Sequence, residues 1–476
     1  MVEDFNRNKY KKENRNQYIT ISKKFKEDLN TMTRKYSSFM GILVFFLIIV
    51  ITGCAVHSIH NESYVSDAIS GRTGHELRSI DEEGVLKLPD DVSLADGLTE
   101  NEAVAIALWN NAQFQADLVG LGFARADLID AGLLRNPVLS LLFPLGPKQL
   151  EATLNLPIDF FWQRPKRVAA AKLNAEQVAD NLIQHGLNLI RDVMIAYTEL
   201  ELARERADII TEEAALREEI AEIASARLEI GDISELEETA IRLEASRTQE
   251  ASIRSVRDAK IAEERLKSLL GLGMEEITLE LSPSSDLIEF TQPPSELLPA
   301  AYAARPDLRA AEIAIEAAGY RVGWERSKIF NLTAVLDANG EGREGFEMGP
   351  GFQLELPILN WNNGKVSRAK AELTQAAKQY IAVKHRITRE VLEARTHYTA
   401  AQKALRILRV DILPAATTAA NNATEAYSIG EISYLELLDF KRQLLSSRLR
   451  KAEAEADMRK AEVSLKHSIG FKPLDQ

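Results

Sequence analysis

Apolar side chains recur every seven residues within residues 166–228, a stretch without proline, and just beyond it. The positions are Ile195, Leu202, Ile209, Leu216, Ile223 and Ile230. Strict seven-residue spacing predicts a long helix that packs in a supercoil. Ala207, Ala214 and Ala221 fall about 200° away around the helix, so a second helix can approach that face closely. About 60 residues of helix would reach roughly 90 Å.

The same pattern occurs a second time. Val391, Tyr398, Leu405 and Ile412 are again seven apart, until Pro414 is expected to bend or interrupt the helix. Segment 230–237 returns 199 positions later as 429–436, and Leu-x-Leu-Pro-Ile at 154–158 returns at 354–358. The chain therefore contains two copies of one unit. We place them at 98–273 and 295–470, with helical hairpin tips near residues 231 and 430.

Alternating apolar and polar residues predict two strand pairs between the helices, at about 138–158 and 329–358. Such alternation is the weak signature of a membrane barrel. Four strands cannot close a barrel, and an open sheet edge cannot face lipid, so a membrane-spanning form requires several copies. Two copies would give eight strands, which leave no conduit, and three would give twelve. Trp162 and Trp361 follow the repeated Leu-x-Leu-Pro-Ile, where an aromatic membrane-interface belt is expected.

The amino-terminal sequence is typical of an export signal. Residues 39–51 are apolar except for Gly41, a length that suits a secretory signal better than a membrane span. Residues 1–53 form this signal region, and the basic segment from Met32 suggests that translation starts there and that the 31 upstream residues are not translated. The signal resembles a bacterial lipobox ending at Cys54. This residue is the only cysteine, so no internal disulfide is possible. Acylation would account for the presence of a single thiol in an exported protein.

The segment after the signal, residues 54–97, lacks sustained periodicity and is predicted to be a lipidated tether over the folded body. Ala55 follows the cysteine in place of the aspartate that retains such lipoproteins at the inner membrane, which favours the outer membrane. Ten of the 58 basic and five of the 71 acidic side chains lie in residues 1–53, leaving 48 and 66 and a net charge of −18. Such an acidic protein is a poor candidate for binding nucleic acid.

No arrangement of residues in the sequence predicts catalysis or a cofactor. No nucleotide-binding loop stands between a strand and a helix, and no nucleophile, base and orienting partner form a recognisable motif. His57 and His60 lie in the tether and are expected to be solvated, and the remaining histidines lack a second ligand four residues on. The sequence therefore predicts neither an enzyme nor a metal site.

Taken together, these features resemble the TolC family of outer-membrane efflux proteins, specifically its lipid-anchored members. The likeness covers about residues 95–470 and includes Asn136-Pro137 before the first strand, the segment 305–312 (Arg-Pro-Asp-Leu-Arg-Ala-Ala-Glu) and the two Ile-Gly turns. It implies an α+β membrane protein: a homotrimer whose twelve strands form one outer-membrane β-barrel. Long antiparallel coiled-coil helices would continue it as a periplasmic α-barrel. The partners implied are outer-membrane lipid, a periplasmic adaptor and an inner-membrane pump.

The resemblance also assigns roles to particular positions. The hairpin tips Gly231, Asp232, Gly430 and Glu431 match the ends where the adaptor docks. Glu436 and Asp439 match acidic residues at the closed tunnel entrance, where a trimer would bring six carboxylates together and repulsion would raise some of their pKa values. Ser433-x-x-Glu436 is also a helix capping box, which is an alternative role for Glu436. Asp439 lies too far into the helix to cap it.

Two questions stay open at this level. A lipid-anchored periplasmic coiled-coil scaffold without channel activity is the alternative function. The exported substrate is also open, because several TolC relatives that export heavy-metal ions share the Asn-Pro before the first strand, whereas the sequence shows no ligand set for a metal.

Overall fold

The computed structural model describes residues 56, 58–77, 88–89, 92, 97–143, 145, 150–273, 277–282, 290–340 and 346–471. All but the first of these belong to one compact unit, His57–Gln476. The signal region 1–53 and Cys54 lie outside the described residues. A search of the described helices finds none that is long and apolar enough to cross a membrane.

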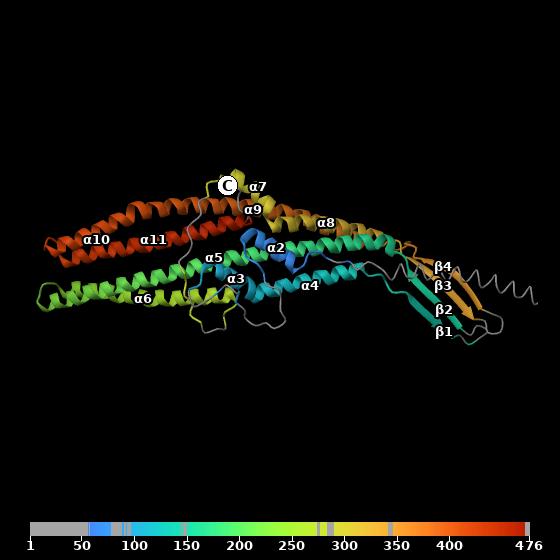
Figure 1. Cartoon of the computed structure of the whole chain (residues 1–476), viewed down its shortest axis with the longest axis horizontal. Coiled ribbons are helices and arrows are strands. Elements are labelled where there is room, and N and C mark those ends of the chain that lie inside the picture. The colour runs from blue at the N-terminus through green and yellow to red at the C-terminus, as the bar shows by residue number, and fades with distance from the viewer. Residues whose placement is uncertain are drawn as a thin grey trace, which may run out of the picture. The chain divides into compact units, whose positions relative to one another are not determined.

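Helix α5 (Phe160–Glu229) is the central element of this unit, and it runs for 70 residues. It contacts α4 and α6 on one side and α8 and α11 on the other (Figure 1). The remaining helices are α2 (Glu62–Thr73), α3 (Glu100–Asn110), α4 (Ala112–Gly132), α6 (Glu235–Leu270), α7 (Pro294–Ala304), α8 (Pro306–Ser327), α9 (Asn363–Ile407), the π-helix η2 (Leu408–Ile412), α10 (Leu413–Ser428) and α11 (Tyr434–Ser468). Two helical hairpins, α5–α6 and α10–α11, reach the end of the unit opposite the sheet (Figure 1).

The small residues of α5 form its most consistently buried face in the hairpin. Ala207, Ala214 and Ala221 are all buried, as predicted for a face that another helix approaches closely. The seven-residue stripe of large side chains is covered less evenly, because Ile209 is buried whereas Ile230, at the tip, is 79% exposed. The alanine face thus packs within the chain, and part of the large stripe remains accessible.

Each repeat has a hydrophobic core of its own. The first core gathers large side chains of α2, α3, α4, α5 and α6, including Leu187 and Tyr197 of α5. The second gathers side chains of α7, α8, α9 and α11 around Tyr398. The Tyr197 hydroxyl lies within hydrogen-bond distance of the carbonyls of Leu98 and Ser282 and shares its one hydrogen between them, which ties the start of the first repeat to the segment that follows it.

The four strands form one antiparallel sheet in the order β1-β2-β3-β4. They are β1 (Val138–Leu142), β2 (Leu150–Pro157), β3 (Leu332–Gly340) and β4 (Phe346–Leu354). The second pair differs from the sequence prediction of about 329–358, since β3 begins at Leu332 and residues 355–358 lie outside β4. Pro350 is tolerated because β4 is an edge strand, where a missing N–H costs no ladder bond.

The tether prediction for 54–97 is wrong over residues 62–73, which form α2. Asn61 caps this helix, and Val65 and Ile69 are fully buried against the first core. Ile69 fits a notch in α5, since a Cβ on Gly186 would come within 2.5 Å of its Cδ1. The expectation that His60 is solvated is also wrong, because its side chain is buried with Nδ1 unpartnered.

The second long helix is interrupted where Pro414 predicted an interruption. Helix α9 ends at Ile407, the five-residue π-helix η2 follows, and α10 begins at Leu413 with Pro414 in its first turn. Proline lacks the N–H that an α-helix needs, and a π-turn is one way to absorb the mismatch. The corresponding part of α5 is continuous, so the two repeats differ here.

Candidate functional site

The sheet carries apolar side chains on one face and mostly polar ones on the other. Its register places these residues on the apolar face: Leu139, Leu141, Leu150, Ala152, Leu154, Leu156, Leu332, Ala334, Leu336, Ala338, Met348, Pro350, Phe352 and Leu354. The opposite face carries the polar residues Ser140, Glu151, Thr153, Asn155, Thr333, Asp337, Asn339, Glu347 and Gln353, together with the apolar residues Val138, Leu142, Pro157 and Val335. Thr153 donates a 2.8 Å hydrogen bond to Asp337 across that face. An exposed apolar surface of this kind is typical of contact with lipid or protein.

Both edges of the sheet are open within the described part of the chain. Strand β1 pairs only with β2, and β4 pairs only with β3. Phe352 of β4 is 76% exposed, and the apolar residues of β1 are exposed as well. Unpaired backbone groups beside an apolar face require further strands before the sheet can enter a lipid environment.

The two tryptophans expected near a membrane interface lie close to the sheet in different settings. Trp162 is half-buried in the first turn of α5, and its Nε1 donates a 3.3 Å hydrogen bond to the Ser327 carbonyl of α8. Trp361 lies between β4 and α9 and is 54% exposed. Trp361 is therefore free to contact other molecules, whereas Trp162 also joins the two repeats.

The hairpin tips use the same backbone geometry in both repeats. Gly231 and Gly430 both have φ 79°, in the left-handed region that favours glycine. Asp232 N–H donates to the Arg227 carbonyl at 2.8 Å, and Glu431 N–H donates to the Ala426 carbonyl at 2.9 Å. This six-to-one bond is the Schellman motif that ends a helix. The motif leaves Asp232 and Glu431 at the extremity of the unit.

Glu436 caps the start of α11. Its carboxylate accepts a 2.7 Å hydrogen bond from the Ser433 backbone N–H, and Ser433 Oγ accepts one from the Glu436 N–H. The bond from the Ser433 backbone lowers the pKa of Glu436. Ser234 and Glu237 form the equivalent box at α6. Glu436 therefore has the capping role that the sequence offered as an alternative, and its side chain is exposed.

Asp439 is held by its own helix. It accepts hydrogen bonds from Arg442 at 2.5 Å and Gln443 at 3.0 Å. Burial opposes its ionisation, but these bonds and the nearby charge of Arg217 outweigh that effect and lower its pKa. Within one chain both predicted gate residues are therefore stabilised as anions, the opposite of the upward shift expected where six carboxylates meet.

Polar contacts between α5 and α11, which the sequence did not reveal, join the two hairpins. The Tyr434 hydroxyl donates a hydrogen bond to the Glu219 carboxylate near the tips. Farther from the tips, Arg448 pairs with Glu212 at 3.5 Å, and Arg206 pairs with Glu453 at 4.0 Å. The contact of Tyr434 with Glu219 fixes the first turn of α11, which contains Glu436 of the predicted gate.

A buried ionic cluster occupies the segment 305–312 that opens the second repeat. Arg305 donates hydrogen bonds to both oxygens of Asp307, at 3.0 and 2.7 Å, and to Glu390 of α9 at 2.5 Å. Burial would lower the pKa of Arg305, but its pairing with Asp307 and Glu390 raises it. The cluster therefore holds α8 against α9. Arg305 and Asp307 pair with each other and with charged side chains of α9.

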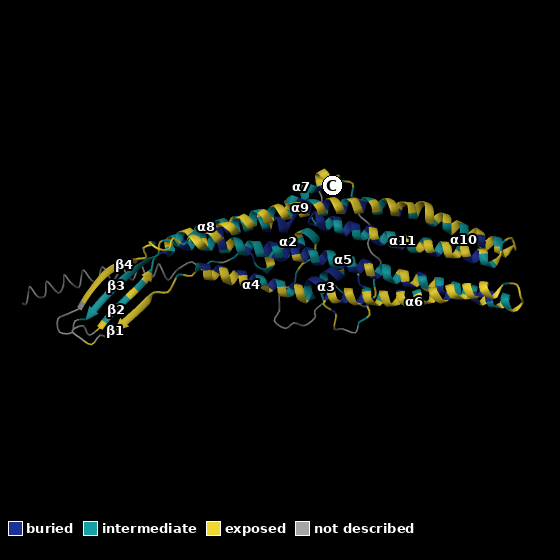
Figure 2. Ribbon diagram, turned by 180° about the vertical axis from the view of Figure 1, so that it is seen from behind, coloured by how far each residue is buried: buried dark blue, intermediate teal, exposed yellow. Residues whose placement is uncertain are grey.

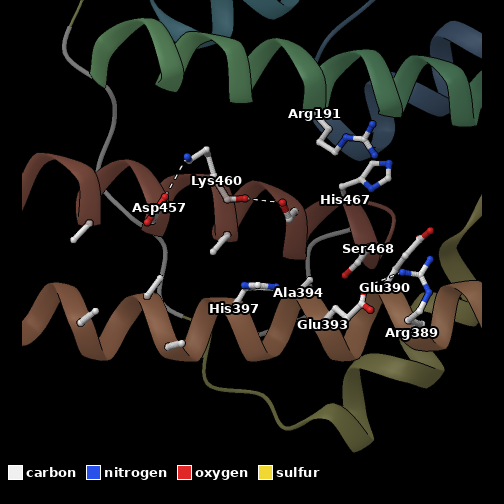
Figure 3. A pocket seen from close by; sticks show the side chains of 16 residues that line it. Arg191, Arg389, Glu390, Glu393, Ala394, His397, Asp457, Lys460, His467 and Ser468 are labelled. Atoms are coloured by element: carbon white, nitrogen blue, oxygen red, sulfur yellow. Dashed lines mark hydrogen bonds and ion pairs between the residues drawn. The ribbon is translucent and has the colours of Figure 1, made fainter. Parts of the chain in front are cut away.

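A groove of about 840 Å³ lies between α9, α11 and α5 (Figure 3). His397 of α9 and His467 of α11 both line it, below Arg191 of α5. Burial lowers the pKa of His467 to about 3, so this imidazole is neutral at physiological pH. Asp457 and Lys460 pair at 3.1 Å. No group of three metal-ligating side chains is found among the described residues, here or elsewhere.

The comparisons with known proteins agree with this geometry. A family model described as "Outer membrane efflux protein" matches residues 146–272 and 297–471. The cobalt-zinc-cadmium resistance protein CzcC of Cupriavidus metallidurans is 26% identical over 361 residues, 75% of this chain and 86% of CzcC. The outer membrane efflux protein BepC of Brucella suis is 25% identical over 327 residues, 66% of this chain and 70% of BepC.

Solved structures share the fold. The outer-membrane channel OprN superposes with a TM-score of 0.66 and 23% identity, covering 83% of this chain and 97% of OprN. The CmeC outer membrane channel of Campylobacter jejuni superposes with a TM-score of 0.64 and 18% identity, covering 83% of this chain and 92% of CmeC. Because the family model spans both repeats, the chain belongs to the outer membrane efflux protein family, whose members are channels and not enzymes.

Proposed function

We propose that this protein is the outer-membrane channel of a tripartite efflux system and conducts substrate passively. The observation that carries the proposal is the four-stranded sheet, with one apolar face and two open edges, at the end of the unit opposite the hairpin tips. Copies of the sheet joined edge to edge would face lipid with the apolar side and a lumen with the polar side. Three copies supply the twelve strands of a conducting barrel.

The two edge surfaces of the helical part support a homotrimer closed head to tail. Helix α9 forms one edge and carries ten basic and three acidic side chains, a net +7. Helices α4 and α6 form the other edge and together carry a net −3. Both edges are largely exposed (Figure 2) and include apolar residues such as Phe123 and Ile381. Charge complementarity favours contact of α9 in one copy with α4 and α6 in the next.

A substitution at this edge tests the trimer. Phe123→Glu places a charge on an exposed apolar residue of α4, and native mass spectrometry of the detergent-purified protein is expected to show monomers in place of trimers. Ile59→Glu, at an exposed apolar residue on neither edge helix, is the matched control and should leave trimers intact. A trimer that survives Phe123→Glu would show that this face of α4 is not part of the contact between subunits.

At the tips, we propose that Gly231, Asp232, Gly430 and Glu431 contact the adaptor, and that Glu436 and Asp439 surround the tunnel entrance. Support comes from their common position at the end of the unit, within nine residues of one another in the second repeat, and from the exposure of the acidic side chains. Glu436 then has two roles, because capping uses one carboxylate oxygen and leaves the other exposed.

Single-channel conductance in a planar bilayer tests channel and entrance together. The wild-type trimer is expected to give small cation-selective currents, which should grow and lose selectivity in the Glu436→Ala/Asp439→Ala variant. The matched control is Glu237→Ala, which removes the equivalent capping carboxylate of the first repeat. If Glu237→Ala changed the current equally, the effect would be one of capping. Folded protein that never conducts would instead support the lipid-anchored scaffold.

We further propose that Cys54 is acylated and anchors the protein at the outer membrane, with the helices extending into the periplasm. The proposal rests on the signal-like run that precedes this single cysteine. Metabolic labelling with an alkyne-bearing palmitate should label the wild type and not Cys54→Ser. Equal labelling of both would refute the anchor.

Divalent metal ions are the cargo that we propose, because CzcC is named for cobalt, zinc and cadmium resistance and 86% of its length is matched. A conduit needs no resident metal site, so the absence of a ligand cluster among the described residues is compatible with this cargo. Loss of the protein should lower the zinc concentration that cells survive and leave tolerance to organic drugs unchanged. The reverse result would assign the channel to drug efflux.

A further inference from the structure

Helix α2 touches both repeats and is held by a small apolar surface. Its buried side chains are Val65 and Ile69, which lie in the core of the first repeat. At the end of the helix, Arg72 donates a 3.5 Å hydrogen bond to the Ala304 carbonyl of α7, in the second repeat. Segments with few buried apolar contacts open at a lower free-energy cost than the core helices do. Helix α2 is therefore suited to local opening.

His60 is buried where α2 begins, directly before the capping residue Asn61. The side chain is 5% exposed, and its ring lies edge-on to Tyr64 with 4.7 Å between the ring centroids. Its Nδ1 is buried and has no hydrogen-bond partner among the described residues. Both ring nitrogens carry a hydrogen in the imidazolium form, so protonation would leave an N–H buried without an acceptor. Such a group destabilises the packed state.

The charged groups that act on His60 lie on α5 and α8. They are Lys172 and Glu176 of α5 and Arg309 of α8. Glu176 is engaged by Arg309, which donates a 2.7 Å hydrogen bond to it. Burial lowers the pKa of His60; Glu176 counters this effect, whereas Lys172 and Arg309 add to it. The imidazole is therefore neutral at neutral pH, and a proton would bring it a charge of the same sign as two of its neighbours.

We propose that α2 is an acid-sensitive clasp between the two repeats, and that protonation of His60 releases it. In the released state water accepts hydrogen bonds from both ring nitrogens, so a proton binds the released state more tightly than the packed one. The packing of α2 is therefore fully stable above the ordinary pKa of 6.5 and is weakened as the pH falls below that value. Release of the helix would also loosen the hydrogen bond from Arg72 to the second repeat.

Asp180 of α5 titrates in the same pH range and acts in the opposite direction. It is 2% exposed, and its charge interacts with both Tyr64 and Arg72 of α2. Burial raises its pKa to about 6, so a proton on Asp180 favours the packed state. The replacement Asp180→Asn removes this titration. The effect of His60 is therefore best measured in the Asp180→Asn protein.

Hydrogen exchange in residues 62–73 of the detergent-purified full-length protein tests the proposal, with mass spectrometry at pH 7.5 and pH 5.0. Protection factors are compared because they remove the effect of pH on the intrinsic exchange rate. In the Asp180→Asn protein we expect protection to fall at least five-fold at pH 5.0. The limit is about 30-fold, set by a released imidazole with a pKa of 6.5. Adding His60→Gln should keep protection within two-fold between the two pH values.

Two further variants in the same background locate the effect. His185→Gln is the matched control, because this histidine of α5 is 52% exposed and pairs with Asp117 at 3.0 Å, so the fall in protection should persist. Lys172→Gln removes one like charge from the surroundings of His60 and should make the fall smaller. This variant also decides the matter if His60→Gln already loosens α2 at pH 7.5.

The proposal is overturned if the Asp180→Asn protein is equally protected at both pH values. A fall of the same size with His60→Gln would overturn it as well, because another group would then carry the pH dependence. An unchanged fall with Lys172→Gln would show that like charge does not drive the release.

Discussion

The hydroxyl of Tyr434 donates its hydrogen to the carboxylate of Glu219, 215 residues away in sequence, and so fastens the first turn of α11 to α5. The same bond raises the pKa of Tyr434 to about 12, which keeps the phenol protonated at any physiological pH. Tyr434 lies four residues after the Gly430 tip and directly beside the capping box of Glu436. The position of the proposed entrance on α11 therefore depends on a contact with the other repeat.

Replacing Tyr434 by phenylalanine should loosen the entrance. The lost bond is worth about 1 kcal/mol at this exposed site, or roughly a five-fold change in the ratio of two conformations. We expect a several-fold rise in open probability in single-channel recordings. Tyr427→Phe is the control, because this ring packs on Tyr434 at 5.1 Å and keeps the bond to Glu219 intact. A Tyr434→Phe channel that opens no more often than wild type would show that the contact does not restrain the entrance.

A charge on the apolar face of the sheet should block membrane assembly. Phe352→Asp is expected to disfavour insertion, by less than the about 2–4 kcal/mol that Arg or Lys costs at the bilayer centre, and to reduce the protein recovered in outer-membrane fractions after density-gradient flotation. The adjacent Gln353→Asp places the same charge on the polar face of β4 and should leave recovery unchanged. Equal recovery of both variants would mean that the register does not separate a lipid face from a lumen face.

The stability of the chain should depend on pH through Asp180. Its folded pKa of about 6 lies above the ordinary value of 3.8, so the folded protein binds more protons than the unfolded chain between these values. The free energy of unfolding therefore falls as pH rises through that window and stays reduced above it. Asp180→Asn should raise Tm by about 2–4 °C at pH 7.5 and leave it unchanged at pH 4, by differential scanning fluorimetry. A variant less stable than wild type at pH 7.5 would show that pairing with Arg309 outweighs burial.

Closing the notch beneath α2 should release that helix. A Cβ at Gly186 would lie 2.5 Å from Ile69 Cδ1 and 3.3 Å from the Phe114 ring, so Gly186→Ala forces the end of the Ile69 side chain to shift. We expect about 1–3 kcal/mol of destabilisation and faster hydrogen exchange in residues 62–73. Gly364→Ala is a suitable control because a Cβ there meets open space within a helix. Unchanged exchange in α2 would mean that Ile69 repacks around the added methyl group without loosening the helix.

The sequence predicted the repeat, the strand pairs and the long helices because each leaves a periodic pattern. It did not predict α2, since a 12-residue helix with only Val65 and Ile69 buried has too few contacts to form a pattern. The second strand pair was predicted to end at about 358, beyond the Leu354 end of β4, because Leu354, Leu356 and Ile358 continue the alternation.

The interactions at the sites were harder to predict than the elements. The capping box at Ser433 and Glu436 is local and was visible in the sequence. The bond from Tyr434 to Glu219 joins different repeats, and nothing in either segment indicates the other. Asp180 left a faint signal as a single acid between Ala179 and Leu182, but the side chain that pairs with it, Arg309, comes from α8. Such clusters depend on how the helices are packed together.

The central pairing of the sheet sets an order of events during export. Strand β2 ends at Pro157, and its partner β3 begins only at Leu332. When β1 and β2 emerge from the secretion machinery, the free edge of β2 has no strand to pair with. Its partner β3 emerges only with the second repeat. The helices of the first repeat bury their own core in the meantime, since their contacts are nearer in sequence. The sheet is therefore completed only after the helices of the first repeat have emerged, while α9, α10 and α11 still follow it in the chain.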